Sequence, residues 1–299
     1  MASHPLTSEI AKPPAVVKNS AARPARPNHR MSTRNRFLFF LTAWLIVLMP
    51  FLFWWSTWFG RKLSDTQITA YLNDDKHPRH IQHALVQLGQ RMAHQDPSAA
   101  HSYPQLMRLA THPVEEVRNT DAWVMGQDTS AAAFHETLLK MLQDSSPMVR
   151  GNAALSLVRF GDAAGRPQIV ALLQPASIVA PTTGRVIDID KVGTSVRQGG
   201  LIAKLQDGDR TTEIRTPISG RIRALSVAIG ANVTSGAEVA SIDPGSEQVW
   251  EALRALYLVG EPDDLTAIRI YERNVPEIPD RLRAQALLTE RAIQARATK

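Results

Sequence analysis

A glycine-punctuated pattern occurs twice in succession in the second half of the chain. APTTGRV at residues 180–186 recurs as TPISGRI at 216–222, and GTSVRQG at 193–199 recurs as GANVTSG at 230–236. Each copy places short β-branched stretches between glycines that permit tight turns, and each copy ends in an apolar stretch. The duplication predicts a compact module of short strands over residues 177–244.

This arrangement resembles the biotinyl/lipoyl domain, an all-β barrel-sandwich hybrid that also occurs in the periplasmic adaptor (membrane fusion) proteins of efflux and secretion systems. The resemblance implies a modifiable lysine in the hairpin between the two halves, but Asp209 occupies that place. Lys204 belongs to the preceding strand and Lys191 to the opposite side of the first half, so neither replaces it. Because biotin and lipoate are attached through a lysine amine, we expect no cofactor. Residues 207–212 leave room only for a tight turn, whereas efflux adaptors insert a long helical hairpin there.

A second repeat precedes the β module and has helical character. VRNTDA at residues 117–122 recurs as VRGNAA at 149–154, and apolar residues at helical spacing follow each copy. These residues, with the Gly-Asp turn at 161–162, resemble HEAT repeats of the short bacterial variety. The resemblance implies an α-α solenoid over residues 65–174, whose stacked helix pairs present an extended surface to partners. A similar Ala-Leu core returns within residues 246–297, so the β module is expected to be an insertion between helical repeats.

An uncharged apolar run near the N-terminus, Phe37 to Phe59, is long enough to cross the hydrocarbon core of a bilayer as a helix. We expect an uncleaved, single-pass transmembrane helix, since a cleaved signal peptide has a shorter apolar core. The basic residues 1–36 are expected to form a disordered tail, which the positive-inside rule places in the cytoplasm. The later domains would then be periplasmic or extracytoplasmic, on a protein of the inner membrane.

The excess of positive charge does not indicate nucleic-acid binding. The first 36 residues carry seven Lys and Arg against one Glu, which accounts for the whole net charge of +6. A basic surplus confined to one short tail differs from the basic folded face that nucleic acids bind, so we expect no nucleic-acid partner. The chain has no Cys, which excludes disulfides, thiol catalysis and Cys-ligated metals.

The strongest metal candidate in the sequence is the triplet His77, His80 and His83. On an ideal helix the first and last of these point about 120° apart, so a solvated helix face is favoured and no metal site is expected. The paired acids at 74–75 and 263–264 fit helix ends and turns better than a catalytic pair. Because the sequence has no phosphate-binding loop or dinucleotide fingerprint, we expect no catalytic residues.

The fold class predicted from these features is multidomain α plus β, with a single transmembrane helix, a HEAT-like solenoid and an inserted all-β barrel-sandwich hybrid. The favoured function is a non-enzymatic, membrane-anchored scaffold of the cell envelope that binds protein partners, with oligomer formation left open. The alternative is an accessory, adaptor-like subunit of an efflux or secretion system.

Overall fold

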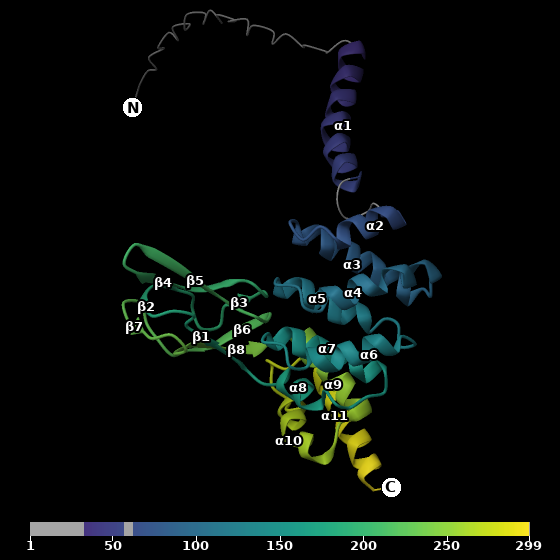
Figure 1. The fold of residues 1–299 in the computed structure, drawn as a ribbon. Coiled ribbons are helices and arrows are strands. Elements are labelled where there is room, and N and C mark those ends of the chain that lie inside the picture. The colour runs from purple at the N-terminus through teal and green to yellow at the C-terminus, as the bar shows by residue number, and fades with distance from the viewer. Residues whose placement is uncertain (1–32, 57–61, 299) are drawn as a thin grey trace, which may run out of the picture. The chain divides into compact units, whose positions relative to one another are not determined.

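The computed structural model describes residues 33–56 and 62–298 (Figure 1). Contacts divide the chain into two units, Met1–Arg61 and Lys62–Lys299. The first unit contains one described helix, α1 (Thr33–Ser56). Most of the tail that the sequence predicts to be disordered, residues 1–32, lies outside the described residues.

The prediction of a transmembrane helix at 37–59 is wrong, and with it the localisation to the inner membrane. Within residues 33–56 and 62–298, no helix has both the length and the apolar character that a bilayer crossing requires. Helix α1 takes in the basic residues Arg34 and Arg36 at its start, and its described part ends at Ser56. It therefore does not coincide with the uncharged run on which the prediction was based, whose last residues, 57–59, lie outside the described part.

The second unit consists of helices and of a β module inserted among them. Prolines at first helical positions and polar caps set the helix starts. At α7, the Ser146 hydroxyl accepts hydrogen bonds from the backbone N–H groups of Met148 and Val149, just after Pro147. In chain order the α- and 3₁₀-helices are α2 (Asp65–Leu72), α3 (Pro78–Ala93), η1 (Pro97–Ser102), α4 (Tyr103–Leu109), α5 (Glu115–Met125), α6 (Ala132–Met141), α7 (Pro147–Arg159), α8 (Arg166–Ala171), α9 (Ser246–Val259), η2 (Pro262–Asp264), α10 (Leu265–Ile268), η3 (Arg269–Glu272) and α11 (Asp280–Ala297).

The longer helices α3, α5, α7, α9 and α11 pack against one another in that order, and one apolar core includes residues from all of them. Buried hydroxyl groups join two of the neighbouring pairs. Ser156 Oγ of α7 donates to the Ala122 carbonyl of α5 at 2.8 Å, and Thr289 Oγ1 of α11 donates to the Leu253 carbonyl of α9 at 2.9 Å. The same contact thus occurs before and after the β module, which indicates that α9 and α11 extend the stack begun by α3, α5 and α7.

The β module contains two antiparallel four-stranded sheets and has an apolar core of its own. The strand order is β1-β8-β6-β3 in one sheet and β5-β4-β2-β7 in the other, and the strands lie between α8 and α9 in the chain (Figure 1). Their bounds are β1 (Ala176–Val179), β2 (Gly184–Ile189), β3 (Ser195–Val196), β4 (Leu201–Asp207), β5 (Arg210–Arg215), β6 (Gly220–Leu225), β7 (Asn232–Val233) and β8 (Glu238–Pro244).

The prediction of a barrel-sandwich hybrid needs correction, because the described strands form two separate open sheets and not a closed barrel. At the sheet edges, β3 pairs with β6 and β7 pairs with β2 over only two residues each, and both pairings lie within a single sheet. Two glycine turns nevertheless link the duplicated halves. The Gly193 N–H donates to the Ile222 carbonyl at 2.8 Å, and the equivalent Gly230 N–H donates to Val186 at 2.7 Å. Both glycines have φ near +90°, which favours a residue without a Cβ.

Candidate functional site: polar ladders and exposed face of the helical array

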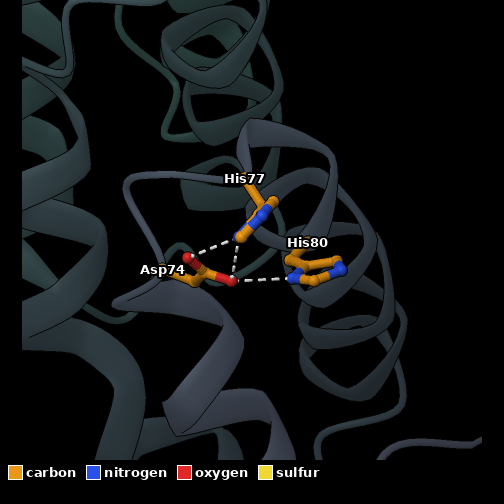
Figure 2. A group of neighbouring side chains, drawn as sticks. All are labelled: Asp74, His77 and His80. Carbon is orange, nitrogen blue, oxygen red and sulfur yellow. Dashed lines mark hydrogen bonds and ion pairs between the residues drawn. The ribbon is translucent and has the colours of Figure 1, made fainter.

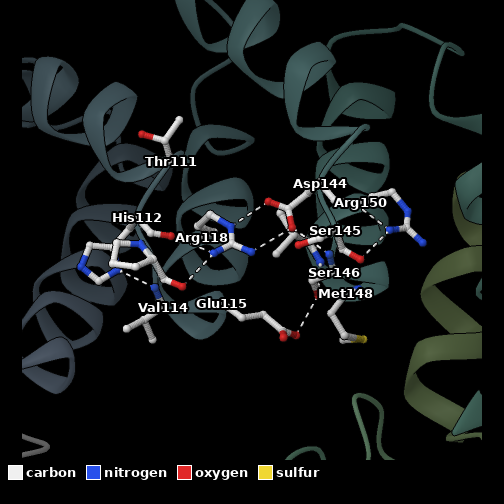
Figure 3. A network of polar contacts seen from close by, with 12 residues as sticks. Thr111, His112, Val114, Glu115, Arg118, Asp144, Ser145, Ser146, Met148 and Arg150 are labelled. Carbon is white, nitrogen blue, oxygen red and sulfur yellow. Dashed lines mark hydrogen bonds and ion pairs between the residues drawn. The ribbon is translucent and has the colours of Figure 1, made fainter. Parts of the chain in front are cut away.

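An arginine at the start of each repeated helix binds the loop that precedes it (Figure 3). Arg118 Nη1 donates to the carbonyls of the residues six and five positions earlier, at 2.7 and 3.2 Å. Arg150 Nη1 makes the same pair of contacts, at 2.7 Å to the Asp144 carbonyl and 3.0 Å to the Ser145 carbonyl. The repeated Val-Arg pair therefore orders the loop between helix pairs as well as starting a helix.

Arg118 also joins one repeat to the next through Asp144. Its Nε and Nη2 donate to the two carboxylate oxygens at 2.7 and 2.9 Å, and the side chains are only 13% and 10% exposed. The guanidinium holds the pKa of Asp144 below its ordinary value, against the opposing effect of partial burial. Asp144 further accepts from the Ser146 N–H at 2.8 Å, while Ser146 Oγ donates to Glu115 at 2.7 Å (Figure 3). This network of polar contacts, the first ladder, fixes the spacing of α5 and α7.

A second ladder joins the short helices to the turn inside the following repeat. Tyr103 of α4 donates to Asp128, and His135 of α6 lies 2.7 Å from Asp162. Burial, and then the hydrogen bond to the neighbouring carboxylate, raises the pKa of Tyr103 to about 12. In each case the acid lies in the turn between the two helices of the next pair.

The second ladder continues across the β module. Arg166 of α8 lies 3.4 Å from Asp264 and 2.7 Å from Glu261, in the turn that follows α9. Gln248 Nε2 of α9 donates to the Leu172 carbonyl at 3.0 Å, although the two residues are 76 positions apart. These contacts make α9 the neighbour of the α7–α8 pair. The helical array therefore continues from α8 to α9, although the β module lies between them in the chain.

The last helices of the array expose large apolar side chains. Leu258 on α9 is 60% exposed and Leu288 on α11 is 50% exposed, with Tyr257 exposed beside the first of them in the sequence. Because Thr289 is hydrogen bonded to Leu253, these two helices lie in contact. Single exposed apolar side chains are ordinary on protein surfaces, whereas a contiguous apolar patch marks a protein-binding surface, so Leu258 and Leu288 are candidate contact positions only.

The two tryptophans of the array have different environments. Trp250 on α9 is partly buried against the core, and the guanidinium groups of Arg254 and Arg281 lie 4.5 and 3.8 Å from its ring centroid. Trp123 on α5 remains 41% exposed, yet its ring covers Gly89 of α3 so closely that a Cβ there would lie 2.8 Å from the ring. Both therefore pack between neighbouring long helices.

Gly126 allows α5 and α7 to approach, and its substitution tests the stack. A Cβ at Gly126 would lie 2.5 Å from Ser156 Oγ and 3.1 Å from Ser156 Cα, so the α7 backbone must move. We expect Gly126→Ala to lower the free energy of unfolding by about 1–3 kcal/mol in urea titrations, the usual range for overpacking. The loss should be smaller when Ser156→Gly is also present. Gly126 has φ −67°, where alanine suffers no backbone strain, so the expected loss comes from crowding alone. An unchanged or increased stability would therefore contradict the packing described here.

The remaining residues singled out in the sequence are dispersed. Asp209 follows Gly208 in the two-residue turn of the β4–β5 hairpin and is exposed. Lys204 is 3.7 Å from Asp188 across β4 and β2, and the Lys191 N–H donates to the side chain of its neighbour at 2.9 Å. The expected tight turn at the hairpin is present, and the carrier-lysine place carries a carboxylate.

Sequence reasoning missed Asp121, which is fully buried on α5. Neither of its carboxylate oxygens has a hydrogen-bond partner within the described residues. Burial raises the pKa of Asp121 well above its ordinary value, although the charge of Arg108 acts in the opposite direction. The signal was an acid inside the repeated apolar stripe VRNTDA, at the position where the next repeat has alanine.

The HEAT-repeat family model matches residues 136–164. This segment is therefore similar to a HEAT repeat. The match runs from the middle of α6 through α7 and its following turn, so the HEAT unit includes Asp144, Arg150 and Asp162 of the two ladders. The resemblance inferred from the repeated Val-Arg segment is confirmed for this part of the chain.

Other comparisons add little about function. No curated protein matches the chain. One similar solved structure is described as a "single-chain, multi-domain long-chain acyl-coa carboxylase", with 15% identity and a TM-score of 0.24. The similarity covers 47% of this chain and 14% of that one, so the chain spans about one seventh of that structure. Similarity of the β module to periplasmic adaptors stays a prediction, as does the adaptor-like role.

Proposed function

We propose that the chain is a non-enzymatic scaffold that binds protein partners through its helical array, with the β module as a second surface. The observation that carries this proposal is the continuous stack of long helices, which ends in α9 and α11 with Leu258 and Leu288 exposed. HEAT repeats stack so that each pair contacts only its neighbours and leaves an extended face for partners. The HEAT match at residues 136–164 lies within this stack.

The charged side chains that join neighbouring helix pairs have a structural role. Arg118 and Asp144 connect α5 with the loop before α7, and Arg166 connects α8 with the turn after α9. These groups contact one another or loop carbonyls, which holds the helices at a fixed spacing. A rigid array of this kind presents exposed side chains in a constant geometry, which lowers the entropy lost when a partner binds.

Co-purification with a surface variant tests the proposal. Leu258→Glu combined with Leu288→Glu places one charge at each of the two exposed apolar positions without touching the core. We expect recovery of the bound protein, identified by mass spectrometry from wild-type material, to fall at least about ten-fold, equivalent to 1.4 kcal/mol or more.

The matched control is Ala132→Glu combined with Gln143→Glu, which adds two charges at exposed positions on and just after α6. This control should retain the partner, and circular dichroism should show the same helix content in all three proteins. Equal recovery with both double variants would remove Leu258 and Leu288 as partner contacts from the proposal. Purification of the wild-type chain without any stoichiometric partner, from its own cells under mild conditions, would contradict the scaffold function itself.

A further inference from the structure

Three potential metal ligands meet at the turn between α2 and α3 (Figure 2). Asp74 lies in this turn, His77 is the N-cap of α3 and His80 is in its first turn. His77 Nδ1 is 2.9 Å from Asp74 Oδ2, and His80 Nδ1 is 2.8 Å from the same oxygen. One ligand atom from each residue lies within 4.8 Å of the other two. The helix spacing of the histidines does not bring them together by itself; the carboxylate from the preceding turn does.

The neighbouring acid faces a different part of the molecule. Asp75 is bound by Arg108 of α4 at 3.1 Å, and Arg108 Nη2 also donates to the Leu72 carbonyl at 2.6 Å. These contacts anchor the turn to the next helix pair. The two adjacent acids thus have different partners: Asp75 binds Arg108, whereas Asp74 contacts the two histidines.

The histidine rings are held by their surroundings to different degrees. The Tyr71 ring of α2 stacks on His80 at a centroid distance of 4.5 Å with an interplanar angle of 13°. The His77 ring lies 5.0 Å from the His80 ring, and its side chain is 62% exposed. One imidazole is therefore fixed in orientation, while the other is free to adjust to a ligand.

We propose that Asp74, His77 and His80 form a binding site for a first-row divalent cation, with Zn²⁺ as the best fit. Two imidazole nitrogens and one carboxylate oxygen are donors that Zn²⁺ accepts at about 2.0–2.2 Å, which places tetrahedral ligands about 3.3 Å apart. The two nitrogen–oxygen separations of 2.8 and 2.9 Å have to open by about half an ångström, and the ligand atoms of the two histidines, which lie within 4.8 Å of each other, have to take up the same spacing. A water molecule or a side chain of a partner completes the coordination.

The position of the site disfavours cation binding in one respect, because the N-terminus of α3 is the positive end of the helix dipole. The negative charge of Asp74 opposes this effect and reduces the net charge of the site once the cation is bound. The competing arrangement is a carboxylate that accepts two Nδ1–H hydrogen bonds and holds no metal. The two arrangements differ in their response to zinc.

Zinc titration of the untagged full-length chain tests the proposal. Isothermal calorimetry should show one Zn²⁺ per chain bound more tightly than any background site. Asp74→Asn, His77→Ala and His80→Ala should each weaken this binding at least about ten-fold, since even outer-shell changes at metal sites cost 10- to 100-fold. His94→Ala and His101→Ala, which remove exposed histidines elsewhere in the same unit, should leave it unchanged.

A second measurement keeps the result independent of folding defects. Co²⁺ added to the wild-type chain should give the visible absorption of a four- or five-coordinate ion, and Asp74→Asn, which preserves the side-chain shape, should abolish it. Circular dichroism should show unchanged helix content in that variant. Absence of zinc binding to the wild-type chain, or binding that all five variants retain equally, would overturn the proposal and leave a hydrogen-bonded Asp–His cluster.

Discussion

We expect Asp121→Asn to become more stable relative to the wild-type chain as the pH rises from acid to neutral. Asp121 is fully buried, and its carboxylate oxygens lack hydrogen-bond partners within the described residues. Burial disfavours the charged form, so the pKa of this carboxyl is raised well above 3.8 in the folded chain. The folded protein therefore retains a proton that the unfolded chain releases.

The sign of the pH dependence follows from this difference. Below the unfolded pKa both states are protonated at Asp121, and its ionisation costs nothing. As pH rises above that value, the unfolded state ionises first, so the wild-type chain loses up to about 1.4 kcal/mol per pH unit until the folded pKa is reached. The Asp121→Asn variant has no such ionisation. Its free energy of unfolding minus that of the wild type should rise steadily from about pH 4 towards neutral pH.

Urea titrations at several pH values measure this difference. Asp144→Asn is the matched control, because Arg118 lowers the pKa of Asp144 in the folded chain. Its stability relative to the wild type should therefore fall as pH rises through the range in which Asp144 ionises, the opposite direction to Asp121→Asn. A flat profile for Asp121→Asn would mean that Asp121 is ionised or water-exposed in the folded state.

Removing the guanidinium of Arg118 should cause the largest loss of stability in the array. Arg118→Ala removes the bidentate partner of Asp144, whose side chain is 10% exposed in the wild-type chain, and it removes the donor to the carbonyls of His112 and Pro113. Breaking a buried pair from one side costs about 3–5 kcal/mol, and we expect a loss of about 3 kcal/mol in chemical denaturation.

The exposed pair of Arg223 and Asp243 provides the comparison. These side chains are 59% and 49% exposed and 3.3 Å apart, so Arg223→Ala should cost less than about 1 kcal/mol. A double-mutant cycle with Asp144→Ala separates the Arg118–Asp144 coupling from the loss of the carbonyl contacts. A small loss for Arg118→Ala, similar to that for Arg223→Ala, would show that the ladder does not stabilise the stack.

The sequence predicted features that depend on neighbouring residues better than features that depend on distant ones. The repeated Val-Arg segment indicated helix pairs of the HEAT type, and the match at residues 136–164 confirms it there. The membrane span at 37–59 was wrong, because an uncharged run says nothing of where the helix begins and ends. The predicted barrel-sandwich hybrid was also wrong in that the described strands close no barrel, because the duplication does not encode how strands pair at the sheet edges.

The candidate sites show the same division. The spacing of His77, His80 and His83 predicted that the first and last point about 120° apart, since it treated them as points on one helix. Asp74 lies before that helix, in a turn whose path depends on Asp75 and its contact with Arg108. The contacts that continue the array past the β module join residues 76 and 98 positions apart, and no local pattern reports contacts over such separations.

Chemical cross-linking across the β module tests the continuity of the helical array, on which this account depends. The chain has no native cysteine, so Arg166→Cys with Glu261→Cys introduces one defined pair where an ion pair of 2.7 Å now joins α8 to the turn after α9. A short bismaleimide should link these positions within single chains of native protein, and urea should abolish the link. Arg166→Cys with Arg210→Cys, at the β4–β5 hairpin, should not react in this way. Failure of the first pair to cross-link, with both cysteines accessible to a monofunctional maleimide, would contradict an array that is continuous past the insertion.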